Sequence, residues 1–248
     1  MDNRNRFDGK GEIYAKARPK YAKALFEYLK NVLNVPFDSV FADIGSGTGI
    51  FTEQLLDCWR KVYAVEPNAD MRRKAEERIS RIESFISVDG SDADTKLPDG
   101  SVDFVTAAQA FHWFDAEAFG KECRRILRPG GKVMIIYNFR DPNADCTKAL
   151  AELRHRYSPE FQGFSNGIND EKCKAFFVRE CTVFRADNTQ YYDRQGYIDR
   201  VLSSSYSTRE SDGRYSEYLT DIGRVFDSFS ADGIIAVPTK TAAYIGKV

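Results

Sequence analysis

The chain has 248 residues, of which 42% are hydrophobic and 29% charged, and its formal net charge is −1. This length can bury a large core without staples, and the near-neutral charge argues against an enzyme that neutralises nucleic-acid phosphates. The five cysteines are scattered and include no C-x-x-C pair, so no disulfide framework or metal site is expected. Residues 1–10 are polar, and no apolar run approaches the roughly 20 residues of a membrane span. We therefore expect a cytoplasmic protein without a nucleic-acid partner.

The first half of the chain alternates short apolar runs with amphipathic segments. The apolar runs predict strands at 40–44, 62–65, 85–88, 102–107 and 132–137. Helical spacing predicts helices at 51–59, 68–80 and 116–127, the last stopped by residues 128–131 (RPGG). Strands separated by helices indicate a parallel sheet with helices on both faces.

The pattern loosens after Asn138. Residues 145–177 are helical and irregular, 183–186 predict a sixth strand, and 193–203 and 215–229 predict two further helices. The chain ends in two short predicted strands, 233–237 and 241–245, which we expect to form the last hairpin of the sheet. No Pro/Gly/Ser-rich linker interrupts this half. We therefore expect a single domain over 1–248, with 145–230 holding inserted helices that cap the sheet.

A glycine-rich loop, residues 45–49 (GSGTG), lies where the first strand meets the first helix. Ligands bind at the carboxyl ends of strands in open α/β sheets, and glycines let a backbone approach a ligand closely. A nicotinamide-binding loop needs a third glycine where this chain has Ile50, and a P-loop needs a lysine that is absent here. Asp43, just before the loop, would repel a pyrophosphate but suits a ligand that carries an ammonium group.

Glu66 ends the second predicted strand, 23 residues after Asp43. An acid at about this distance beyond a glycine loop is placed to accept ribose hydroxyls. Alternatively, Glu66 caps the next helix, whose start carries Pro67 and Asn68. In combination with Asp43 and the loop, the ribose interpretation is favoured.

The loop, Glu66 and residues 127–131 (LRPGG) resemble the class I S-adenosylmethionine-dependent methyltransferases. The resemblance implies an α/β fold: a Rossmann-like, doubly wound, seven-stranded, mostly parallel sheet with a reversed C-terminal strand. It also implies that the loop backbone holds the methionine part of S-adenosyl-L-methionine, that Glu66 holds the ribose and that Met71 packs near the adenine. The expected cofactor-binding residues are Asp43, Gly45, Ser46, Gly47, Thr48, Gly49, Glu66, Pro67, Met71, Ser91, Asp92, Ala108 and Gln109.

Three later segments are similar to a narrower, small-molecule branch that includes trans-aconitate methyltransferase-like proteins. They are residues 88–91 (VDGS), 97–103 (LPDGSVD) and 107–114 (AAQAFHWF). Residues 7–19 and 202–206 are similar to that branch as well. The chain departs from it after the third strand, where many members carry Gly-Asp-Ala-Glu and this chain has residues 90–93 (GSDA). We therefore expect Ser91 or Asp92 to contact the adenine amine.

Residues 107–110 follow the fourth strand and should lie near the reacting methyl group. Gln109 could bind the cofactor through its backbone or its side chain. The aromatic residues that follow should line the floor of the substrate site, although Trp113 and Phe114 could equally be core residues. His112 is either a general base, a hydrogen-bond donor that binds an anion, or a structural histidine.

Near the N-terminus, Tyr14 and Arg18 are expected to fold over the site, and Arg18 could pair with a carboxylate of cofactor or substrate. With His112 and Trp113 they are the predicted substrate-binding residues. Weaker candidates in the second half are Tyr191, Tyr192, Arg200 and Tyr206.

The sequence thus predicts in-line methyl transfer to a small-molecule acceptor, with a carboxylate oxygen as the expected nucleophile. The alternatives are a non-catalytic S-adenosylmethionine-binding regulator and a nicotinamide oxidoreductase, against which Asp43 and Ile50 argue.

Overall fold

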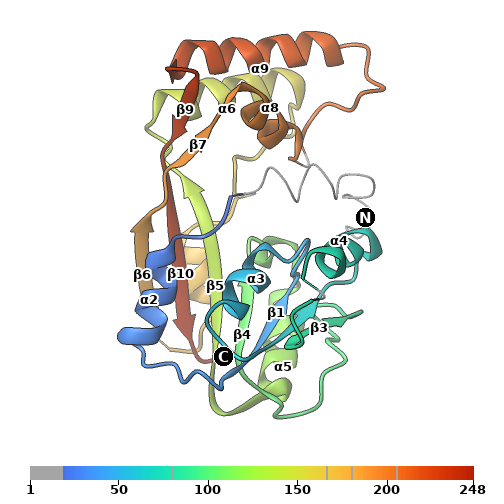
Figure 1. The fold of residues 1–248 in the computed structure, drawn as a ribbon, viewed down its shortest axis with the longest axis vertical. Helices are drawn as coiled ribbons and strands as arrows, with labels where there is room; N and C mark the ends of the chain where they lie inside the picture. The colour runs from blue at the N-terminus through green and yellow to red at the C-terminus, as the bar shows by residue number, and fades with distance from the viewer. Residues whose placement is uncertain (1–18, 80, 166, 180, 205) are drawn as a thin grey trace.

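The computed structural model describes residues 19–79, 81–165, 167–179, 181–204 and 206–248. A central sheet of seven strands has the order β3-β2-β1-β4-β5-β10-β6 (Figure 1). Its strands are β1 (Val40–Ile44), β2 (Lys61–Val65), β3 (Phe85–Val88), β4 (Val102–Ala108), β5 (Leu127–Arg140), β6 (Thr182–Asp187) and β10 (Thr239–Gly246). Only β10 runs against its neighbours, pairing antiparallel with both β5 and β6. The predicted fold class, a mostly parallel sheet with a reversed last strand, is confirmed.

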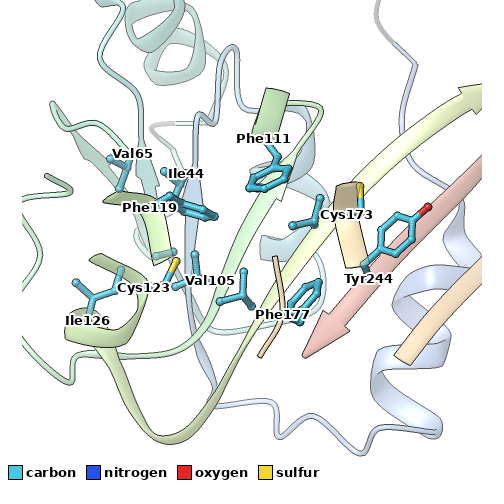
Figure 2. Close-up of a cluster of buried hydrophobic side chains, with 14 of the residues drawn as sticks. Ile44, Val65, Val105, Phe111, Phe119, Cys123, Ile126, Cys173, Phe177 and Tyr244 are labelled. Atoms are coloured by element: carbon cyan, nitrogen blue, oxygen red, sulfur yellow. The ribbon is translucent and has the colours of Figure 1, made fainter. Parts of the chain in front are cut away.

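Alternate residues of the central strands feed two separate cores, one on each face of the sheet. Ile135 and Tyr137 of β5 face one core, whereas Met134 and Ile136 face the other. On the first face, Phe119, Cys123 and Ile126 of α5 (Ala116–Ile126) pack on the sheet, and α7 (Asp170–Ala175) adds Cys173 (Figure 2). The second face is covered by α2 (Lys23–Asn31) and α3 (Ile50–Leu56). Because both faces are buried, the strands are continuous apolar runs, which made them visible in the sequence.

A further layer lies beyond the ends of β5 and β10, at the top of Figure 1. It consists of α6 (Asp145–Tyr157), α8 (Arg194–Leu202), α9 (Tyr215–Phe229) and a small sheet of β7 (Gln190–Tyr192), β9 (Ile234–Val237) and β8 (Ser230–Ala231). We call these elements the helical layer. They share a third core, in which Leu150, Tyr197 and Tyr218 are buried. None of the helices in the described part of the chain is long and apolar enough to cross a membrane.

The predicted terminal hairpin is wrong. Val237 of β9 pairs with Gln190 of β7, whereas Thr239 of β10 pairs with Arg140 of β5, so the chain passes from the small sheet into the large one. Pro238 separates the two ladders because it lacks an N–H, and its carbonyl accepts a hydrogen bond from Asp141. A proline between two short strands therefore marks a change of sheet here and not a tight turn.

Other elements differ from the prediction in smaller ways. Helix α4 (Ala69–Ile79) and strand β6, by contrast, agree with it. β5 begins at Leu127, so residues 128–131 belong to a strand and not to a connection. Helix α2 and strand β7 lie where no element is predicted, although Leu25, Phe26 and Leu29 of α2 are spaced along one helical face and buried.

Candidate active site

A cavity of about 490 Å³ opens at the carboxyl ends of β1, β2, β4 and β5, between the sheet and the helical layer. Its volume lies within the roughly 300–1,000 Å³ that small-molecule sites occupy. The predicted cofactor residues that line it are Asp43, Gly45, Ser46, Gly47, Thr48, Glu66, Pro67, Met71, Ser91, Asp92, Ala108 and Gln109. The topology thus brings together residues from four segments of the chain, and Gly49 is the one predicted cofactor residue that the lining does not include.

The three loop glycines have three different surroundings, although all adopt a positive φ. A Cβ on Gly45 would lie 2.7 Å from the Cβ of Ala110, and one on Gly49 would lie 2.5 Å from Cδ1 of Ile79 in α4. A Cβ on Gly47 would meet no atom within 4 Å. Only Gly47 therefore leaves room for a ligand. At Gly49 the missing side chain lets α4 pack against the start of α3, and cofactor binding by Gly49 stays a prediction.

Glu66 connects the loop to the following helix. Its Oε2 accepts a hydrogen bond from the Gly47 N–H (2.9 Å), and its Oε1 accepts one from the Asn68 N–H (2.8 Å). The cap of α4 is Asn68, whose Oδ1 accepts from the Met71 N–H at 3.0 Å. Burial raises the pKa of Glu66, and the two backbone N–H groups oppose that shift. The carboxylate is thus fixed at the cavity wall.

Asp43 is 1% exposed and lies behind the loop. Its two oxygens accept hydrogen bonds from the hydroxyls of Thr52 (2.7 Å) and Thr106 (2.8 Å). The pKa of Asp43 is raised to about 6: burial raises it most, the charge of Glu66 adds to the rise, and the two hydroxyls act in the opposite direction. A cation in the cavity would favour the ionised carboxylate and lower this pKa.

This half of the cavity fits a polar, cationic ligand. The Oγ1 of Thr48 is buried and has no hydrogen-bond partner among the described residues, which leaves a polar atom for a ligand to satisfy. Asp92 and Asp115 line the same cavity as Asp43 and Glu66. Four carboxylates around an open glycine suit a molecule with a sulfonium and an ammonium group.

At the expected adenine end, Met71 is buried and lines the cavity. The Oγ of Ser91 accepts a hydrogen bond from the Asp94 N–H (3.2 Å), and Oδ2 of Asp92 accepts one from the Asp115 N–H (3.2 Å). Both alternatives for the adenine contact therefore line the cavity.

Gln109 adopts a positive φ of 55°, which is strained for a residue with a side chain. Its Oε1 accepts a hydrogen bond from the Asn138 N–H (3.0 Å), and its own N–H donates to the Ile136 carbonyl (2.9 Å). The side chain thus fastens the end of β4 to β5, while the turn that it holds lines the cavity.

Of the aromatic segment after Gln109, Trp113 and Phe114 line the cavity. His112 does not belong to the lining: its backbone N–H and its Nδ1 each lie 3.0 Å from the Oη of Tyr137. Tyr137 is buried, so this contact agrees with the structural alternative for His112. A catalytic role for His112 stays a prediction.

The remaining predicted residues divide. Tyr192 and Arg200 line the cavity, Tyr191 is 69% exposed outside it, and Tyr206 packs on Phe161 with ring centroids 5.3 Å apart. Tyr14 and Arg18 lie outside the described residues.

Arg140, which is not among the residues predicted from the sequence, is the last residue of β5 and lines the cavity. Its Nη1 is buried without a hydrogen-bond partner among the described residues, and its guanidinium lies 4.9 Å from the ring centroid of Phe164. Its place after the fifth strand matches that of Glu66 after the second, which could have drawn attention to it. Other missed lining residues are Asn138, Gln190, Val237 and Thr239.

Comparison with known proteins shows which class of protein this chain resembles. Residues 42–135 match the family described as a methyltransferase domain. An uncharacterised methyltransferase of Schizosaccharomyces pombe is 30% identical over 92% of this chain and 79% of its own length. A methyltransferase-like protein of the same yeast is 29% identical over 61% of this chain, but the match spans only 58% of that protein. A solved structure from Anaeromyxobacter dehalogenans, assigned as a type II methyltransferase, superposes with a TM-score of 0.67, covering 93% of this chain and 97% of that one at 22% identity.

The sheet order and the acidic glycine-loop site define a class I methyltransferase that uses S-adenosyl-L-methionine. The chain belongs to the methyltransferase family, as the 30% identity over most of both chains to the yeast relative shows.

Two glycine substitutions should separate ligand space from packing. Gly47→Ala adds a methyl group that points into the open cavity, so we expect S-adenosylmethionine to bind at least tenfold more weakly, with about 1–2 kcal/mol of lost stability from the positive φ. Gly49→Ala carries the same backbone cost plus the clash with Ile79, and we expect about 2–4 kcal/mol of lost stability. Calorimetric titration and urea unfolding measure both effects. Normal affinity in Gly47→Ala would show that the loop does not face the ligand.

Glu66→Ala is expected to weaken S-adenosylmethionine binding by about 1–3 kcal/mol, because charged hydrogen bonds are lost. Since Glu66 also holds the Gly47 N–H, Glu66→Gln is the control: it keeps the volume and one acceptor oxygen. We expect Glu66→Gln to lose less stability than the alanine variant and still to bind weakly. An unchanged dissociation constant in both variants excludes Glu66 from ribose binding.

Asp43 should make cofactor binding depend on pH. The free carboxyl has a pKa of about 6, and a bound cation favours the ionised form, so affinity should fall as the pH drops below about 6 and level off above 7. Asp43→Asn should bind more weakly at pH 7.5 and lose this share of the pH dependence between pH 5 and 7.5. Titrations of the parent, Asp43→Asn and Glu66→Gln across that range measure it. A parent-like affinity and pH profile in Asp43→Asn contradicts the electrostatic role.

Proposed function

We propose that this methyltransferase transfers its methyl group to a carboxylate oxygen of a small molecule. The observation that carries the proposal is Arg140, whose Nη1 is buried at the cavity without a partner among the described residues. An unpaired buried donor on a permanently charged group costs free energy unless a ligand satisfies it. A carboxylate matches the planar fork of a guanidinium in geometry and in charge.

The division of charge within the cavity supports this choice of acceptor. The carboxylates that line the cavity come from the end of β1 (Asp43) and from the segments after β2, β3 and β4 (Glu66, Asp92 and Asp115), and we call them the acidic half. The cations Arg140 and Arg200 come from β5 and α8, and we call them the basic half. The acidic half suits a cationic methyl donor. The basic half suits an anionic acceptor, and opposite charges on the two ligands favour their close approach.

The lining residues also suit an acceptor that needs no base. When bound, S-adenosylmethionine supplies an electrophilic methyl group on a sulfonium. A carboxylate is ionised at neutral pH, so no side chain has to remove a proton from it. Of the described residues that line the cavity, none is a histidine or a lysine. The work left to the chain is to orient the acceptor through Arg140 and Arg200 and to exclude water with the rings of Trp113, Phe114 and Tyr192.

Within this proposal the loop from Gly45 to Thr48 holds the methionine part of the cofactor, Glu66 the ribose, and Met71 with Ser91 or Asp92 the adenine. The whole chain acts as one domain, and the helical layer caps the acceptor site. The similarity of residues 107–114 to the trans-aconitate methyltransferase-like branch agrees with a small acidic acceptor, and Trp113 of that segment lines the cavity.

Transfer of a labelled methyl group to a panel of aliphatic and aromatic carboxylic acids, amines and phenols tests the proposal. We expect at least one acid to be methylated. Arg140→Gln should raise the KM for that acid at least tenfold, because the anion loses a desolvated charged partner, and leave cofactor affinity within about twofold. Arg60→Gln removes an exposed arginine outside the cavity and is the matched control. Methylation of amines or phenols alone, or an unchanged KM in Arg140→Gln, contradicts the carboxylate assignment.

A further inference from the structure

The surroundings of Arg140 differ from those of most arginines in the described part of the chain. Arg125 pairs with Glu122 and Asp99, and Arg194 pairs with Asp227. Arg140 has no carboxylate within ion-pair distance among the described residues. Its guanidinium instead lies over the ring of Phe164, with 4.9 Å between Cζ and the ring centroid.

We propose that Phe164 is a positioning residue, which holds the Arg140 guanidinium at the cavity while leaving its N–H groups free for the acceptor. A carboxylate partner would fix the side chain equally well, but it would occupy the donors that a ligand needs. An aromatic face attracts the cation through its quadrupole and accepts no in-plane N–H hydrogen bond. The buried, unpartnered Nη1 is the expected result of such an arrangement. This inference rests on the carboxylate acceptor proposed above.

The ring of Phe164 is itself supported from the helical layer. Its centroid lies 5.1 Å from that of Phe161, which is buried and contacts His155 of α6 and Tyr206 edge-on. Ser158, at the end of α6, fixes this arrangement because its hydroxyl donates to the Tyr206 carbonyl at 2.7 Å. A chain of aromatic contacts therefore connects α6 to Arg140. The helical layer thus holds the arginine that we assign to binding the acceptor.

Phe164 is 36% exposed, so its role can be tested with little risk to the fold. Phe164→Leu keeps an apolar side chain and removes the ring face, whereas Phe164→Tyr and Phe164→Trp keep a ring. Phe229→Leu is the matched control, because Phe229 is 38% exposed on α9 and does not line the cavity. Thermal unfolding of each variant shows whether the fold is intact.

Two readouts follow the acceptor. One is the affinity of the protein loaded with S-adenosylhomocysteine for the acid of the panel that the parent binds most tightly. The other is the KM and kcat for methylation. We expect Phe164→Leu to weaken acid binding and raise KM about three- to tenfold, with kcat and cofactor affinity within about twofold. The tyrosine and tryptophan variants should restore parent-like values. In an Arg140→Gln background, Phe164→Leu should have no further effect, because the two residues act through one contact.

The outcomes separate this inference from the proposed function. If Arg140→Gln weakens acid binding while Phe164→Leu behaves like Phe229→Leu, Phe164 is not a positioning residue and the carboxylate proposal stands. Additive losses in the double variant, or no rescue by the ring-keeping variants, likewise overturn the inference. If the parent binds no acid of the panel, or Arg140→Gln has no effect, the proposed function fails and the role of Phe164 fails with it.

Discussion

The hydrogen bond from the Gly47 N–H to the Glu66 carboxylate is the contact on which the part of the cavity assigned to the methyl donor, here called the donor half, depends. It joins the loop after β1 to the end of β2, two segments that the parallel sheet already places side by side. With one oxygen on Gly47 and the other on the Asn68 N–H, Glu66 fixes the loop relative to the start of α4. The same carboxylate faces the cavity, so the group that shapes the loop also supplies charge to the ligand.

That arrangement costs stability in the free protein. Burial raises the pKa of both Asp43 and Glu66, which means that their ionised forms are disfavoured relative to the unfolded chain at neutral pH. Gln109 adds backbone strain at the next strand end. A cationic ligand offsets the electrostatic part of this cost, because it favours the ionised carboxylates that burial disfavours. Features that look unfavourable one by one are thus consistent with a site built for a cation.

The donor half could be predicted from sequence because its residues lie in short local patterns. The loop follows an apolar strand, Asp43 precedes it, and Glu66 ends the next strand, so spacing alone places them at one edge of the sheet. The individual role of Gly49 could not be predicted, because its neighbour Ile79 lies 30 residues away on another helix. For the same reason, the contact of His112 with Tyr137 is invisible in a pattern that shows only an aromatic run. The end of the chain was mispredicted because β9 and β10 are separated only by Pro238, whereas their partners come from distant strands.

The part of the cavity assigned to the methyl acceptor is built from residues that lie far apart in the sequence. Arg140, Tyr192, Arg200 and Thr239 come from four elements and meet only because β5, β7, α8 and β10 converge where the large sheet gives way to the small one. The family match covers residues 42–135, which include the glycine loop, Glu66 and the aromatic segment but end before Arg140. The family match therefore covers the segments that we expect to bind the methyl donor. The charge at the end of β5, and the ring of Phe164 beside it, lie outside residues 42–135, in the part of the chain to which we assign the acceptor.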